Sequence, residues 1–102
     1  MAVNLVVLYR RPDDPEVFVD HFTRVRAPLV QRVPGLVAFQ HGPIEATLEG
    51  SGAWFDLALL AFAGRTQLDA ALAPPEGRAA GRDVRSFAAG LFEMAVQEVV
   101  PS

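Results

Sequence analysis

His21 is the candidate general base of this chain, because an imidazole exchanges a proton near neutral pH. It stands next to Phe22 in a helical pattern and one turn away from Val17 and Val25, which places it where a helix meets a sheet. The alternative is a helix residue whose imidazole is hydrogen-bonded to a nearby carboxylate or carbonyl. The sequence therefore allows either a catalytic or a structural role for His21.

Tyr9 and Arg26 are candidates for holding a ligand. Tyr9 ends a predicted strand, and a buried hydroxyl needs a partner, so it is either a pocket donor or a residue at the edge of the core. Arg26 either clamps an anion through two hydrogen bonds at the mouth of a pocket or lies in solvent beside Arg24.

His41 and Asp56 complete the predicted substrate-binding set. His41 follows Phe39 on the same strand face, so it either points into the pocket or ends the strand in water. Asp56 interrupts an apolar strand, and a buried acid there needs an arginine or a histidine as its partner. We favour a structural ion pair for Asp56 over an acid that serves the pocket.

The residues that the sequence lacks exclude several kinds of chemistry. There is no cysteine and no lysine, which excludes thiolate catalysis, disulfides and Schiff bases. None of Ser51, Ser86 and Ser102 lies in a Gly-x-Ser-x-Gly turn, and no phosphate-binding loop is present. Two histidines are too few for an obvious zinc site. We therefore expect no metal and no cofactor.

The composition is that of one globular domain spanning residues 1–102. Apolar residues make up 51% and charged residues 21% of the chain. The net charge of −3 argues against nucleic-acid binding, which needs a basic face. No apolar run is long enough to cross a membrane, and no signal-peptide pattern opens the chain, so we expect a cytoplasmic protein.

Four strands are predicted from runs rich in β-branched and aromatic residues. They cover residues 3–9, residues from 36 to 40, Trp54–Phe62 and residues 92–100.

The first helix is predicted from a cap and an apolar stripe. Asp14 is a good N-cap, and Pro15 fits the first helical position. Pro28 interrupts the helix, and Pro34-Gly35 ends it. The stripe recurs at spacings of four, three, four and four, at Phe18, Phe22, Val25, Leu29 and Val33.

A second helical region is predicted in two pieces. Thr66 and Asp69 resemble a capping box that opens a short helix, which Pro74-Pro75-Glu76-Gly77 then breaks. Asp83 is predicted to cap the second piece. Residues 74–82 are either a lid over a pocket or an ordinary break between the two pieces.

The order strand, helix, strand, strand, helix, strand predicts a ferredoxin-like α+β fold with a four-stranded antiparallel sheet. Two helices cover only one face of such a sheet. Val6 and Leu8 nevertheless make the other face of the first strand apolar. We therefore predict a homodimer in which sheet packs on sheet to form a dimeric α/β barrel.

In the order of its segments and in their amino-acid sequences, the chain resembles the EthD family of dimeric α/β barrels. The likeness is carried by three places: Tyr9-Arg10-Arg11-Pro12 ahead of Phe18, His21 and Phe22; Ala27-Pro28-Leu29 ahead of Pro34-Gly35-Leu36; and Pro75-Glu76-Gly77 ahead of Asp83 and Phe87. The chain departs from the family in one respect. The family has a histidine two residues before the helix proline, and Arg26 stands there in this sequence.

The resemblance implies a homodimer with a pocket between each sheet and its helices. Related barrels include cofactor-free monooxygenases, muconolactone isomerases and heme-dependent enzymes. The first hypothesis is thus a protein that binds a small apolar or aromatic molecule, with cofactor-free oxidation or proton abstraction by His21 as its chemistry. The alternatives are a non-catalytic stress-response or ligand-binding barrel and a heme-binding barrel.

Overall fold

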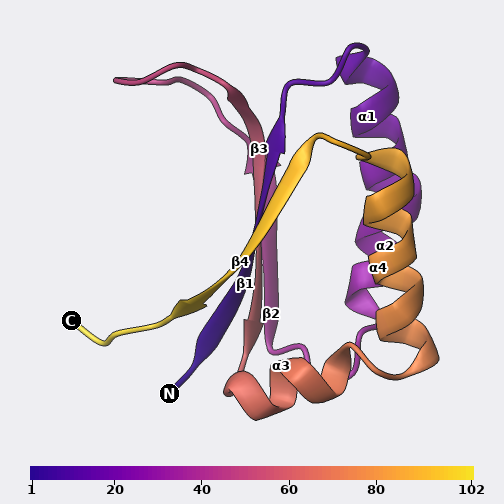
Figure 1. The fold of residues 1–102 in the computed structure, drawn as a ribbon, viewed down its shortest axis with the longest axis vertical. Helices are drawn as coiled ribbons and strands as arrows, with labels where there is room; N and C mark the ends of the chain where they lie inside the picture. The colour runs from indigo at the N-terminus through magenta and orange to yellow at the C-terminus, as the bar shows by residue number, and fades with distance from the viewer.

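The computed structural model describes all 102 residues and contains the predicted strands, with helices between them (Figure 1). The elements in chain order are β1 (Val3–Arg10), α1 (Pro15–His21), η1 (Phe22–Arg26), α2 (Ala27–Gln31), β2 (Ala38–Pro43), β3 (Trp54–Phe62), α3 (Arg65–Ala71), α4 (Pro75–Phe87) and β4 (Phe92–Glu98). The strand ends differ from the predicted ends by up to three residues.

One antiparallel sheet joins the strands in the order β2-β3-β1-β4, which confirms the ferredoxin-like prediction. Alternate residues of β1 point toward the helices because side chains of a strand alternate between its two faces. These are Val3, Leu5, Val7 and Tyr9, and all four are buried. The core therefore lies between the sheet and the helix layer.

The first helix begins as predicted and then contains a π-helical turn. Asp14 caps α1 by accepting a hydrogen bond from the Val17 amide. Because Pro28 has no amide hydrogen, the hydrogen-bond ladder is interrupted just before it. The ladder adjusts through η1, at whose end the Ala27 amide bonds to the Phe22 carbonyl.

The π-helical turn corrects the predicted apolar stripe. Such a turn takes up one residue more than an α-helical turn, so the inward face moves by one position along the sequence. Arg26 and Val30 are buried, whereas Val25 is 41% exposed and Leu29 is only partly buried. The prediction was therefore right for Phe18 and Phe22, which precede the extra residue, and wrong immediately after it.

The second helical region differs from the prediction in three ways. The N-cap of α3 is Gly64, which has no side chain that could cap the helix. Asp69 pairs with Arg65 instead, so the predicted capping box is absent. Pro75 occupies the first turn of α4, where a proline loses no helical hydrogen bond, so the proline pair starts a helix instead of breaking one. The suggested lid over residues 74–82 is therefore wrong, because Pro75 and the residues after it are helical.

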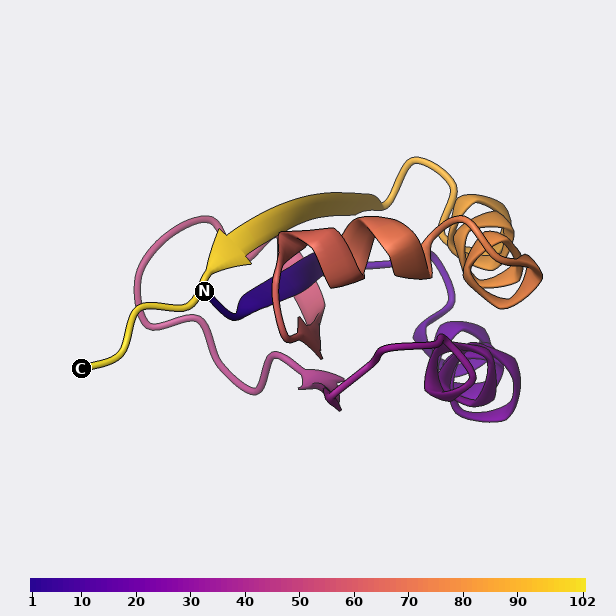
Figure 2. The same cartoon turned by 90° about the horizontal axis from the view of Figure 1, so that it is seen from below.

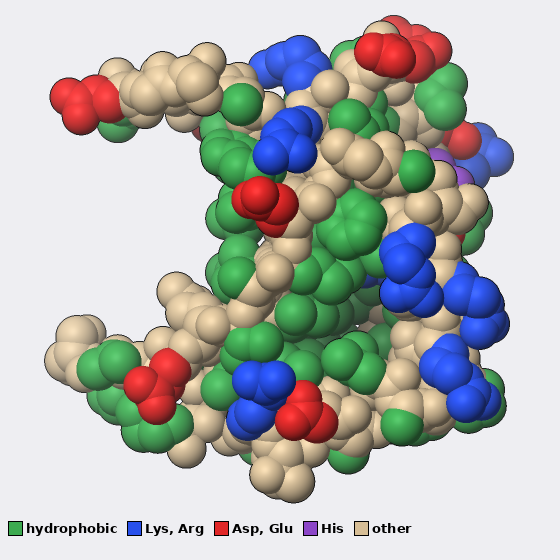
Figure 3. All heavy atoms as spheres, in the orientation of Figure 1, with side chains coloured by type: hydrophobic (Ala, Val, Ile, Leu, Met, Phe, Trp, Pro, Cys, Tyr) green, Lys and Arg blue, Asp and Glu red, His purple; other side chains and the backbone are tan.

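No helix covers the other face of the sheet (Figure 2). Val6 and Leu8 on β1 lie opposite Leu59 and Leu57 on β3, and all four are only partly buried. Figure 3 shows hydrophobic side chains along a hollow on this side of the molecule, between two projecting arms. One arm is the connection between β2 and β3, and the other is the C-terminal end of the chain (Figure 1). We call this surface the open sheet face.

None of the helices combines the length and the apolar character needed to cross a bilayer.

Candidate ligand-binding site

A cavity of about 210 Å³ lies between the sheet and α4. Its walls are mostly apolar, with contributions from Leu5, Val33, Leu60, Phe62, Leu72 and Met94. Its charged lining residues are Arg26, Arg78 and Arg85, and no acidic side chain lines it. Four larger hollows, which lie beside Met1, Pro15, His41 and Leu29, are all more open to solvent. The cavity between the layers is thus the site best suited to enclosing a small molecule.

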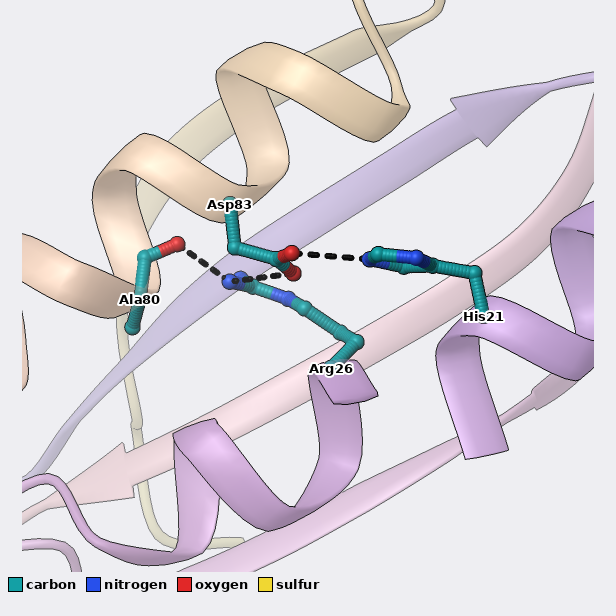
Figure 4. A network of polar contacts seen from close by, with 4 residues as sticks. All are labelled: His21, Arg26, Ala80 and Asp83. Atoms are coloured by element: carbon teal, nitrogen blue, oxygen red, sulfur yellow. Dashed lines mark hydrogen bonds and ion pairs between the residues drawn. The ribbon is translucent and has the colours of Figure 1, made fainter. Parts of the chain in front are cut away.

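Arg26 reaches this cavity because the π-helical turn points it inward. Its side chain is only 3% exposed, so the predicted alternative of a solvent arginine is wrong. One terminal nitrogen, Nη1, donates to the Ala80 carbonyl and lies 3.9 Å from Asp83 Oδ2. Figure 4 shows the guanidinium reaching across to α4. A buried guanidinium at a cavity wall offers further N–H donors to a ligand.

Asp83 joins the two helices that face each other across this layer. Its Oδ1 lies 2.7 Å from His21 Nε2, and its Oδ2 is on the side of Arg26 (Figure 4). Asp83 lies inside the continuous helix α4, so the prediction that it caps a helix is wrong. Its carboxylate instead serves as the partner of two basic side chains from the opposite helix.

His21 lies beside the cavity lining and is not part of it. Its ring stacks on Phe87 at 4.5 Å between centroids, and the side chain is 31% exposed. Its hydrogen bond to a carboxylate is the arrangement that the structural reading of the sequence described. The catalytic role of His21 stays a prediction.

Tyr9 is completely buried among the aromatic rings of Phe18, Phe22 and Phe87. Burial raises the pKa of its hydroxyl because the phenolate would lose its hydration, and the nearby Arg26 guanidinium opposes that shift. The hydroxyl has no hydrogen-bond partner in the protein. Tyr9 is therefore a neutral, buried group beside Arg26, and it does not line the cavity.

Asp56 stands directly opposite Tyr9 in the pairing of β1 with β3. It is 5% exposed and forms no ion pair, so the ion pair that we favoured is wrong. The two arginines that end β1 have other contacts, since Arg10 lies near Glu93 and over Trp54, and Arg11 lies over an aromatic ring. Burial raises the pKa of Asp56 to about 6, against the backbone hydrogen bonds that lower it, and Oδ1 has no partner.

His41 lies on the exposed edge strand β2, away from the cavity. Its ring packs against Phe22 at 4.6 Å and Phe39 at 5.0 Å between centroids. This partial burial lowers the pKa of the imidazole, because the charged form loses hydration. His41 was predicted either to point into the pocket or to end the strand in water, and neither prediction included this packing against aromatic rings.

Of the five predicted site residues, the structure places only Arg26 at the cavity. Tyr9, His21, His41 and Asp56 do not line it. The sequence analysis missed Arg78 and Arg85, which line the cavity from α4. They are seven positions apart, which puts them on one face of a helix, but a helix break was predicted at their N-terminal side.

No family model matches the chain. A curated relative from Rhodococcus erythropolis, described as an uncharacterized 11.0 kDa protein in the thcB-thcC intergenic region, is 33% identical over 87 residues. The match covers 85% of this chain and 84% of that relative. The similarity thus extends over most of both proteins.

Among solved structures, an ethyl tert-butyl ether degradation (EthD) family protein from Bacillus halodurans matches with a TM-score of 0.93 and 28% identity. The match covers 98% of this chain and all of that one. A dimeric ferredoxin-like protein of unknown function from Jannaschia matches with a TM-score of 0.72 and 20% identity, over 97% of this chain and all of that one. SnoaB, a cofactor-independent oxygenase from Streptomyces nogalater, matches with a TM-score of 0.68 and 18% identity, over 99% and 95% of the two chains. The last two likenesses show the fold alone.

Proposed function

The chain belongs to the EthD family, and from this premise we propose that it is a homodimer that binds a small, mostly apolar molecule between the sheet and α4. The observation that carries the proposal is the cavity of about 210 Å³, which lies between the two layers and is mostly apolar in its lining. Sites of this kind bind small molecules through apolar contact, and a few polar groups orient the ligand.

The size of the cavity limits the ligand. At about 30 Å³ for each molecule of liquid water, it holds the volume of about seven waters. Cavities for drug-sized ligands begin at about 300 Å³. The part of the ligand that lies within the cavity is therefore compact, such as a single substituted ring or a short chain.

Cofactor-free proton abstraction by His21 is the second candidate function. The observation in its favour is the hydrogen bond to Asp83, because a carboxylate that accepts from Nε2 leaves Nδ1 as the basic nitrogen. SnoaB, a cofactor-independent oxygenase, has the same fold, which also favours testing this chemistry. His21 does not line the cavity, however, so the geometry favours ligand binding over this reaction.

The heme-binding alternative has less support. It requires a histidine that faces an open cavity, since a haem iron needs an axial ligand. His21 is hydrogen-bonded to Asp83, and His41 packs on aromatic rings at the sheet edge. Neither histidine lines the cavity.

The homodimer rests on the open sheet face. A surface of leucine and valine side chains is stabilised when it is removed from water, and a second copy of the chain offers the same apolar surface. The arms beside it also carry apolar side chains, with Leu48 94% exposed and Val100 70% exposed. Two copies that pack through this face would bury these side chains, in keeping with the dimeric neighbour of the same fold.

Filling the cavity tests the binding proposal. Met94 lines the cavity from β4 and is 40% exposed, so a Met94→Trp side chain occupies ligand space without entering the densest part of the core. Small molecules that bind the native state raise its unfolding free energy by about 2.7 kcal/mol at a hundredfold excess over Kd. We expect a panel of small aromatic and aliphatic compounds to raise the melting temperature of the unsubstituted protein and to have little effect on Met94→Trp.

Val96→Trp is the matched control. Val96 lies on the same face of β4 with 41% exposure, but it is outside the cavity lining. This variant should keep the ligand-induced stabilisation. Equal stabilisation of both tryptophan variants would show that the compounds bind elsewhere and would refute the proposed site.

A further inference from the structure

We infer that the ligand of this cavity is a small organic acid, whose carboxylate is bound by Arg26, Arg78 and Arg85. The inference rests on the proposed function and names its substrate class. The observation behind it is the combination of three guanidinium groups with an otherwise apolar lining that has no acidic residue. Such a site suits a molecule with one anionic end and an apolar body.

Arg78 and Arg85 have no anionic partner within the chain. The ion pairs of the protein involve Arg10, His21, Arg24, Arg26 and Arg65. Arg78 and Arg85 lie on α4 and are exposed to solvent, where each guanidinium remains free to meet a ligand. Figure 3 shows basic side chains gathered over this helix. The positive charge at the cavity is thus only partly balanced by the protein itself.

Gly81 explains how Arg85 lies at the cavity. A Cβ atom at position 81 would be 3.2 Å from Arg85 Nη1 and 3.4 Å from its Nη2. The guanidinium therefore lies over Gly81, on the side of the helix from which Arg78 precedes that glycine by about one turn. The absence of a side chain at Gly81 leaves room for this arrangement beside the cavity.

Arg26 supplies the buried part of the anion site. Asp83 and the Ala80 carbonyl stabilise its charge when no ligand is present. Only Nη1 makes these contacts, and a guanidinium carries five N–H donors, so donors remain for a carboxylate. A carboxylate bound by guanidinium groups forms charge-assisted hydrogen bonds, which are stronger than those of a neutral amide.

Matched pairs of probes test the inference. Benzoate is compared with benzamide, and hexanoate with hexanamide, by titration calorimetry at low ionic strength, because salt weakens partly exposed charge interactions. Each pair has nearly the same shape and differs in charge. We expect each carboxylate to bind at least about tenfold more tightly than its amide.

Arginine variants assign the preference to the cavity. The double variant Arg78→Gln with Arg85→Gln should lower carboxylate affinity by about tenfold and leave amide affinity unchanged. Arg82→Gln is the matched control, because Arg82 is exposed on the same helix, forms no ion pair and does not line the cavity. It should retain the full preference.

The outcomes separate the inference from the proposed function. If the amides bind as tightly as the acids, and Met94→Trp removes both, the cavity binds small molecules and the acid preference is wrong. If neither kind of probe binds the unsubstituted protein, the proposed function is wrong as well. A loss of preference in Arg82→Gln equal to that of the double variant would reflect general charge and would overturn the inference.

Discussion

Gly77→Ala should destabilise the protein by about 3 kcal/mol, at the upper end of the usual cost of overpacking. A Cβ atom on Gly77 would lie 2.0 Å from the Ala71 carbonyl oxygen and 2.8 Å from the Leu72 Cα. These are backbone atoms at the end of α3, so a side-chain rotation cannot relieve the collision. The corner between α3 and α4 must open, and with it one wall of the cavity. Urea unfolding of both proteins measures the difference.

Gly81→Ala is the control for this prediction, because it makes the same change in the same helix. There the new Cβ meets only the mobile end of Arg85. Alanine favours a helix over glycine by about 1 kcal/mol, which offsets the small shift of that side chain. Gly81→Ala should therefore be close to neutral or slightly stabilising. Similar losses of unfolding free energy in the two variants would contradict the close contact between Gly77 and the end of α3.

Asp83→Ala should cost about 3 kcal/mol, because it leaves a buried guanidinium without its counter-charge. The Asp83 side chain is 10% exposed and that of Arg26 only 3%, so water cannot replace the lost carboxylate freely. The substitution also removes the hydrogen-bond partner of His21. Removal of one member of a buried pair typically costs more than the pair itself contributes.

Asp69→Ala provides the comparison for Asp83→Ala. Asp69 lies on α3 and pairs with Arg65 one turn earlier, and both side chains are largely exposed. Pairs of this kind contribute about 0.3–0.5 kcal/mol. The two substitutions change helix propensity in the same way, so their difference in unfolding free energy isolates the buried network. Equal losses would contradict the structural role given to Asp83.

The order of elements was predictable because it depends on local signals. Asp14 and Pro15 mark a helix start, and the apolar run Trp54–Phe62 marks a buried strand. The fold then follows, since few topologies accept this order of strands and helices. The bare apolar face of the sheet also follows from the alternation of Val6 and Leu8 with their neighbours.

The site was less predictable because it depends on two departures from regular local rules. The π-helical turn before Pro28 brings Arg26 inward, and the regular period of an α-helix cannot indicate that slip. The pair Pro74-Pro75 suggested a break in the helix, although proline is also common in the first turn of a helix. That error separated Arg78 from Arg85 and misplaced Asp83.

Buried polar groups were predicted by residue type but not by partner. The sequence indicated that Tyr9 and Asp56 would need partners, but the Tyr9 hydroxyl and Asp56 Oδ1 have none, whereas Arg26 is paired. Which acid meets which base depends on contacts between α4 and the first helix. These contacts join positions more than fifty residues apart, and no local pattern specifies them.

The central claim is that both faces of the sheet are covered, one by the helices that enclose the ligand and the other by a second copy of the chain. Sedimentation equilibrium measures this directly, because the mass of one chain is 11.0 kDa. At micromolar concentration we expect a mass of about twice that value. A folded species with the mass of a single chain would contradict the claim, since the open sheet face would then be stable in water on its own.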